Sequence, residues 1–231
     1  MPEENAAADA DSAEAGCTKM PEIAFDDKFR KQLRDLFVWR RDVRRFRSDP
    51  LPDGALERLI DIACLSPSVG LSQPWRFVIV EDPTRRGAVI DDFKACNADA
   101  LASYSGDRAA RYAALKLSGL EEAPGHLAVF ADKASDIGYG LGRATMPETI
   151  EYSVVAAICS MWLAARADGI GLGWVSILNP MRIKEILDVP SSQKLVAYLC
   201  VGYPQTESDY PELEQMGWEY RHPSSEFTVR R

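Results

Sequence analysis

Residues 40–47 read Arg-Arg-Asp-Val-Arg-Arg-Phe-Arg, and this stretch carries the strongest local chemical signal in the chain. Five guanidinium groups crowded into eight positions repel one another, and an anion bound among them would relieve that repulsion. The planar fork of arginine donates two hydrogen bonds at once, which suits a phosphate. The alternative is a solvated helix end whose arginines form salt bridges with surplus carboxylates. The spacing alone leaves both interpretations open.

Asp42 is the one acidic side chain in this stretch. Because neighbouring positive charge favours the ionised form of a carboxylate, we expect Asp42 to be charged. A carboxylate beside a bound phosphate repels it, so the presence of Asp42 there requires another purpose. A simple bridge between Asp42 and an arginine is the structural alternative.

Hydrophobic periodicity predicts the elements on either side of this stretch. Helices are predicted at residues 26–38, 52–65, 84–93, 98–120, 148–167 and 180–187, and strands at residues 75–80, 128–131, 172–178 and 196–201. The helix at residues 148–167 is apolar on nearly every face, so it must be covered all round, in a core or at a subunit interface. The irregular tail after Tyr203 is rich in aromatic residues, which indicates packing, for instance on a second subunit.

Three loops are candidates for ligand contact. The loop at residues 66–75 leads from a helix into a strand, and Ser68 and Gly70 there can approach a planar ligand closely, although a helix stop followed by turns is the simpler interpretation. The glycine runs at residues 138–142 and 169–173 look superficially like dinucleotide loops. The first lacks a preceding strand of useful length, and the second leads from helix into strand, the reverse of the Rossmann fingerprint. We expect the second run to make a tight helix exit.

Composition narrows the class of protein. With 231 residues, 46% of them hydrophobic, the chain is long enough for one globular domain. A net charge of -8 argues against nucleic acid or an anionic membrane as the partner. Residues 1–22 are predicted to be a disordered acidic tail without signal-peptide features, and residues 23–231 a single domain. The cysteines are scattered, and Cys64, Cys159 and Cys200 lie in apolar runs, which indicates a cytoplasmic protein with reduced core cysteines. Two histidines are too few for a metal-ligand cluster, so we expect no metal site, and a site made of carboxylates alone is the remaining alternative.

Three motifs, in order, resemble those of the FMN-dependent nitroreductase superfamily. Residues 40–46 resemble its R-R-S-x-R-x-F signature, residues 67–77 its P-S-x-x-N-x-Q-P-W-x-F loop, and residues 202–204 its G-Y-P. The resemblance implies an α+β, nitroreductase-like fold with a central, mostly antiparallel sheet flanked by helices. It also implies a homodimer with domain-swapped tails and with the flavin at the subunit interface.

Two departures from these motifs point to one branch of the superfamily. Asp42 stands where a serine is usual, and Leu71 where an asparagine is frequent. Together with the run at residues 173–178, they resemble the cytoplasmic oxidoreductases that make 5,6-dimethylbenzimidazole, the lower ligand of vitamin B12 (cobalamin). This branch uses molecular oxygen to fragment reduced FMN (FMNH2), and erythrose 4-phosphate is the second product. FMN is then the substrate, no metal is needed, and a separate NAD(P)H-dependent flavin reductase supplies FMNH2.

The resemblance also implies roles for individual residues. The FMN-binding residues would be Arg40, Arg41, Asp42, Val43, Arg44, Ser68, Gly70, Lys116, Val175 and Ser176. The arginines would hold the phosphate and ribityl end, Lys116 the pyrimidine edge, and Ser176 would lie near flavin N5. Asp42 and Ser176 would be catalytic, as general base for ribityl C–C cleavage and as hydrogen-bond donor. Residues 99–120 would form a lid that excludes water.

Other functions compete with this one. An NAD(P)H-dependent FMN nitroreductase or flavin reductase would share the fold, although Asp42 in place of serine favours fragmentation. A non-catalytic flavin-binding module is an alternative of another class, and nucleic-acid binding through the arginines is opposed by the net charge.

Overall fold

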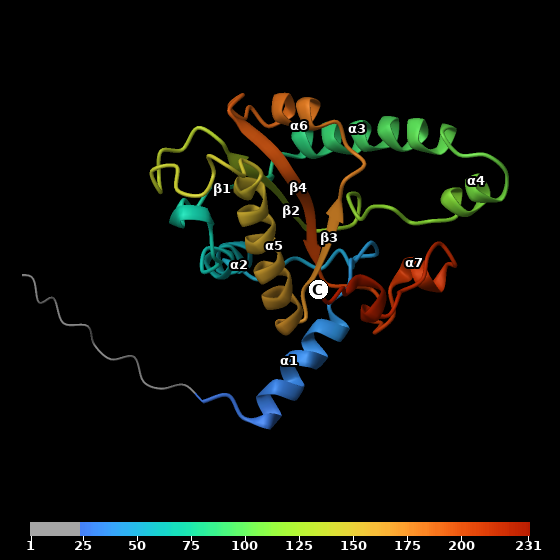
Figure 1. Cartoon of the computed structure of the whole chain (residues 1–231). Coiled ribbons are helices and arrows are strands. Elements are labelled where there is room, and N and C mark those ends of the chain that lie inside the picture. The colour runs from blue at the N-terminus through green and yellow to red at the C-terminus, as the bar shows by residue number, and fades with distance from the viewer. Residues whose placement is uncertain (1–23) are drawn as a thin grey trace, which may run out of the picture.

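The computed structural model describes residues 24–231. Within them, an antiparallel sheet of four strands forms the centre of the fold (Figure 1). The strands are β1 (Trp75–Ile79), β2 (Gly125–Asp132), β3 (Gly171–Val175) and β4 (Gln193–Gly202), in the spatial order β1-β2-β4-β3. Every neighbouring pair is antiparallel, which confirms the predicted sheet. The predicted acidic tail at residues 1–22 lies outside the described residues.

Helices cover both faces of this sheet (Figure 1). The described residues form the helices α1 (Asp27–Trp39), α2 (Ala55–Ala63), α3 (Pro83–Ala102), α4 (Gly106–Ala113), α5 (Thr149–Ala167), α6 (Pro180–Ile186) and α7 (Glu212–Gln215), with 3-10 turns η1 (Val69–Leu71) and η2 (Ser224–Phe227). Of these, α2, α3, α5 and α6 cover the sheet, whereas α1 and α4 lie away from it (Figure 1). Alternate residues of β2 explain the two layers: Leu127 and Val129 pack in the core with α2 and α5, whereas Ala128 and Phe130 pack in the core with α3 and α6. A sheet covered on both faces has buried strands, and β2 is buried along nearly its whole length.

The predicted helices at residues 84–93 and 98–120 are wrong in their boundaries. α3 is one continuous helix of 20 residues, Pro83–Ala102, because nothing between Lys94 and Ala102 breaks a helix. α4 contains only 8 residues and ends at Ala113, and an irregular segment follows it. β3 is also shorter than predicted, since it ends at Val175.

α5 is the central helix, but one chain does not cover it completely. Its apolar length would allow a membrane span by length and composition alone, as the core helix of a soluble protein also would. It contacts α2 and all four strands, which identifies it as a core helix. Tyr152 and Val155 on its outer face remain 57% and 37% exposed. Complete coverage, as predicted, therefore requires something beyond this chain.

α1 buries none of its residues, although its sequence is amphipathic. Phe25, just before the helix, and Phe29 and Phe37 within it are between 41% and 55% exposed. Such a concentration of exposed aromatic side chains is unusual for a surface that faces only water.

The predicted burial of the cysteines is correct for Cys200 and wrong for two others. Cys200 in β4 is buried, but Cys64, which caps the C-terminal end of α2, and Cys159 in α5 are exposed. Cys64, Cys96, Cys159 and Cys200 are all free thiols.

Candidate functional site

The arginine segment, residues 40–47, lies directly against β3. Asp42 forms a parallel bridge with Leu172, and the Val43 amide donates to the Leu172 carbonyl over 2.9 Å. A Cβ atom on Gly173 would lie only 2.1 Å from the Val43 carbonyl oxygen. Glycine at this position of the 169–173 run therefore permits contact between two backbones. The expected tight helix exit is also present, since Gly169 has a φ of +71° after α5.

Phe46 fixes the other end of the segment. Its side chain is 1% exposed and lies against Gly119 and Gly202, where added Cβ atoms would be 2.3 and 3.1 Å from the ring. Gln205 donates from Nε2 to the Phe46 carbonyl over 2.8 Å. The segment is thus held at both ends outside α1, which ends at Trp39, so the helical part of the alternative is wrong. Its salt bridges are present, however, at Arg45 and Arg47.

The arginines of the segment differ in what they bind. Arg45 pairs with Glu212, Arg47 pairs with Asp49 at 2.7 Å, and Arg41 donates to the carbonyls of Val38, Arg40 and Asp209. Arg40 instead stacks over the Trp162 ring, with 4.8 Å between Cζ and the ring centroid. Among the described residues, the Arg40 guanidinium has no hydrogen bond or ion pair, so its donors are available to an anion.

A cavity of about 140 Å³ opens beside Arg40 and collects four guanidinium groups. It is lined by Arg40, Arg41, Arg44 and Arg221, together with Asp42, Glu212, Pro211 and Leu213. Sequence analysis missed Arg221, which the C-terminal tail brings to the cluster across the chain. The aromatic residues of that tail indicated packing but gave no sign of where it packs.

The charges in this cavity fit a phosphate. Burial, and then the neighbouring Arg221 and Arg40, lower the pKa of the Arg41 guanidinium. Its Nε is buried and has no hydrogen-bond partner. A dianion in the cavity would offset the mutual repulsion and offer acceptors to these donors.

Asp42 is held by two partners at the edge of the same cavity. Oδ1 accepts from the Trp174 amide at 2.8 Å, and Oδ2 accepts from Arg44 Nε at 3.0 Å. Burial raises the pKa of the Asp42 carboxyl, and this exceeds the opposing effects of Arg44 and the Trp174 amide. The sequence interpretation considered only the arginines. In the structure the Asp42 carboxyl is also partly buried, and this burial moves its pKa toward the range in which a general base is effective.

Ser176 and Lys116 lie on elements that adjoin Asp42. Ser176 is exposed directly after β3, two residues beyond Trp174, and Val175 between them is buried. The Lys116 carbonyl accepts from Arg44 Nη1 at 3.3 Å. Its ammonium group pairs with Glu122 at 2.5 Å, so within one chain it binds a carboxylate.

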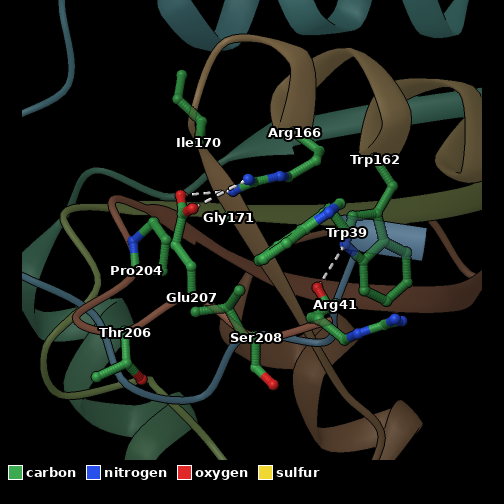
Figure 2. Close-up of a pocket in the computed structure, with 11 residues that line it drawn as sticks. Trp39, Arg41, Trp162, Arg166, Ile170, Gly171, Pro204, Thr206, Glu207 and Ser208 are labelled. Carbon is green, nitrogen blue, oxygen red and sulfur yellow. Dashed lines mark hydrogen bonds and ion pairs between the residues drawn. The ribbon is translucent and has the colours of Figure 1, made fainter. Parts of the chain in front are cut away.

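Ser68 and Gly70 are not brought to the arginine cluster within one chain. Their turn lies beside the start of α5, where the Val69 amide donates to Ser153 Oγ over 3.0 Å. The arginine segment lies beside the end of α5, where Trp162 Nε1 donates to the Arg41 carbonyl over 3.1 Å (Figure 2). Those two positions are separated by roughly 13 Å along the helix axis.

The C-terminal tail, residues 203–222, forms a strap across the arginine segment. Arg166 at the end of α5 donates to both carboxylate oxygens of Glu207, at 2.6 and 3.1 Å (Figure 2). Farther along, the Trp218 ring lies 5.7 and 6.1 Å from the rings of Tyr104 and Tyr112. These tyrosines belong to the predicted lid, whose α4 projects from the body of the molecule near α7 (Figure 1). Within this single chain, the strap packs on residues of the same chain. The predicted homodimer with domain-swapped tails stays a prediction.

Comparison with known proteins identifies the family and the fold of the chain. The profile of the Nitroreductase family matches residues 37–203. The chain is 57% identical to 5,6-dimethylbenzimidazole synthase of Rhodospirillum rubrum, over 86% of this chain and 94% of that protein. It is 42% identical to a 5,6-dimethylbenzimidazole synthase of Rhodobacter capsulatus, over 87% and 97% of the two chains. A crystal structure of oxidised iodotyrosine deiodinase, bound to FMN and 3-iodo-L-tyrosine, has a TM-score of 0.65 and 27% identity, and covers 76% of this chain and 91% of its own.

Proposed function

This chain belongs to the nitroreductase family and to its 5,6-dimethylbenzimidazole synthase branch, and from that premise we propose that it uses oxygen to fragment reduced FMN. The products are 5,6-dimethylbenzimidazole and erythrose 4-phosphate. The single observation that carries the proposal is the position of Asp42: a half-buried carboxylate bonded to Arg44 and to the backbone of β3, at the edge of a cavity lined by arginines.

The arginines supply binding of the substrate phosphate. Arg40 has no hydrogen-bond or ion-pair partner within residues 24–231, so its donors face the cavity unengaged by that part of the chain, and Arg221 lines the same cavity from the strap. Arg41 and Arg44 are largely engaged with protein acceptors, so they contribute mainly positive charge. A phosphate held here fixes the ribityl end of FMN next to the carboxylate of Asp42.

Asp42 and Ser176 act on the part of FMN that is broken. Reduced flavin supplies the electrons that oxygen accepts and also the carbon skeleton of both products. Asp42 takes a proton from the ribityl chain, and its raised pKa makes the proton transfer more favourable than for an ordinary aspartate. Ser176, exposed at the end of β3, donates a hydrogen bond to the flavin edge. The lid, residues 99–120, excludes water while this occurs.

A second copy of the chain completes the site in this proposal. Ser68 and Gly70 lie in a turn beside the start of α5, whereas the arginine cluster lies beside its other end. Each site therefore takes its arginines from one subunit and this turn from the partner subunit. In such a dimer, the second subunit would cover the exposed apolar residues of α1 and of the outer face of α5. Obligate dimers of this kind bury more than about 2,000 Å². Sedimentation as a monomer at micromolar concentration would contradict the dimer.

The test of the function supplies FMNH2 from outside. Purified protein is incubated with FMN, NADPH, air and a separate flavin reductase, and 5,6-dimethylbenzimidazole is measured by mass spectrometry. We expect product only when both the reductase and this chain are present. Continuous oxidation of NADPH by this chain alone, with FMN recovered intact, would make it a flavin reductase or nitroreductase instead.

A further inference from the structure

Two loops that the site left unexplained are interlocked through their backbones. The first is the serine turn, residues 68–73, and the second is the glycine loop, residues 135–143. A Cβ atom on Gly138 would lie 2.3 Å from the Gly70 carbonyl oxygen, and one on Gly70 would lie 2.9 Å from the Leu141 carbonyl oxygen. Neither position can carry a side chain without displacing the other loop.

Side chains hold this arrangement from both ends. The Val69 amide donates to Ser153 Oγ, which itself donates to the Thr149 carbonyl over 2.7 Å, so the turn is tied to α5. Arg143 Nη1 donates to the Ser135 carbonyl over 2.6 Å and closes the glycine loop at its base. The glycine loop therefore forms a fixed wall against the turn.

The serine turn requires such a wall because its backbone is strained. Leu71 and Gln73 have φ values of 52° and 44°, in the left-handed region that side chains with a Cβ rarely occupy. Conformations of this kind persist where the surrounding structure fixes them, and they concentrate at ligand sites. Leu71 is nevertheless 71% exposed, so no hydrophobic packing of its own side chain explains the conformation.

We propose that the glycine loop is a positioning element of the flavin site, which holds Ser68 and Gly70 in the conformation that contacts the flavin ring. The inference rests on the proposed function in one respect, that this turn faces the ring and not the phosphate. It assigns a role to the Gly138-x-Gly140-x-Gly142 run. The prediction that no strand of useful length precedes this run is wrong, because β2 has eight residues and ends at Asp132. The run is still no dinucleotide loop, because the next helix, α5, begins only at Thr149.

The chain offers a matched control for the test. Gly138 and Gly140 have φ values of +80° and +75°, so alanine brings similar backbone strain at both positions. A Cβ on Gly138 collides with Gly70, whereas a Cβ on Gly140 meets only Arg143 Nε, at 3.7 Å. The difference between Gly138→Ala and Gly140→Ala therefore reports the contact between the loops.

The full-length variants are titrated with oxidised FMN and with riboflavin, and thermal unfolding of the flavin-free proteins is recorded. We expect Gly138→Ala to weaken both flavins at least about tenfold relative to Gly140→Ala and to shift the absorption spectrum of the bound flavin. The unfolding temperatures of the two variants should be similar. Equal flavin binding by the two variants, or a loss for FMN without a loss for riboflavin, would overturn the proposal.

A second pair of variants covers the case in which Gly138→Ala does not fold. A Cβ on Gly142 would lie 2.8 Å from Val69 Cγ2, a side-chain atom that can be removed. Gly142→Ala should weaken both flavins, and adding Val69→Ala should restore binding, with Val69→Ala alone as the control. Absence of any loss in Gly142→Ala, or a loss without rescue, contradicts the proposal. These binding measurements do not depend on product formation, so the proposed function can fail while the positioning role stands.

Discussion

If the proposed function is correct, we expect replacement of Asp42 by asparagine to abolish fragmentation of the flavin while leaving flavin binding intact. The variant keeps the size of the side chain, and its amide oxygen can still accept from the Trp174 amide. It loses the negative charge that pairs with Arg44 at 3.0 Å. Because general base catalysis contributes about 10²–10⁴-fold, formation of 5,6-dimethylbenzimidazole should fall at least about a hundredfold. FMNH2 should bind at least as tightly, since a charge that repels its phosphate is gone.

The stability of this variant follows from the sign of the pKa shift. Breaking a buried ion pair usually costs about 3–5 kcal/mol. Here burial raises the pKa of Asp42 despite Arg44, which means that the folded protein already disfavours the charged form. The folded chain thus holds this proton more tightly than the unfolded chain, and ionisation as pH rises lowers stability. We therefore expect Asp42→Asn to change the free energy of unfolding at pH 7 by less than about 1 kcal/mol.

The assay combines three measurements on wild type and variant. Mass spectrometry follows 5,6-dimethylbenzimidazole, fluorescence titration gives FMN affinity, and urea denaturation gives the free energy of unfolding. In the wild type, product formation should also decline on acidification at a pH above the usual range for an aspartate, because the base must be ionised. Product formation by Asp42→Asn near the wild-type rate would refute the base role and leave Asp42 as a spacer between arginines.

Three further predictions concern other residues. Arg40→Ala should weaken FMN binding by about 1.5–3 kcal/mol and leave riboflavin binding unchanged, as measured by titration with both flavins, because its free donors serve the phosphate. Equal losses for the two flavins would make Arg40 structural. Ser176→Gly should retain binding of reduced FMN but suppress product, since a hydroxyl aimed at the flavin edge matters most as charge moves; unchanged product would reduce Ser176 to a surface residue. Burial lowers the pKa of His126 to about 4, so the folded protein resists its protonation and stability should fall as pH drops below the unfolded value near 6.5. Urea denaturation at pH 7 and 5 should show a loss of about 2 kcal/mol that His126→Gln lacks, and equal losses in both proteins would contradict the assignment.

The sheet and the central helix were predictable because their patterns are local. α5 and the strands carry continuous apolar runs. α6 begins at Pro180, directly after the capping residue Asn179, so both residues stand where a helix start favours them. The join within α3 was missed because its polar stretch near Asn97 resembles a loop in composition while containing no residue that ends a helix.

The candidate site was only partly predictable, for a different reason. The crowding of arginines in residues 40–47 indicates an anion site. The sequence does not show, however, which of these guanidinium groups form hydrogen bonds or ion pairs within the protein. Arg45 and Arg47 bind nearby carboxylates, whereas Arg40 stacks on Trp162, a residue more than one hundred positions away. Arg221 reaches the cavity only because the strap crosses the arginine segment. Contacts between distant segments carry no local periodicity, so they require the fold.

The strand order β1-β2-β4-β3 has a consequence for the chain as it leaves the ribosome. β4 pairs with both β2 and β3, so these strands have no common partner until residues 193–202 have been synthesised. The arginine segment rests on β3 and is closed by the strap, which is made later still. We therefore expect the sheet to close, and the arginine segment to be covered by the strap, only after these C-terminal residues have been synthesised.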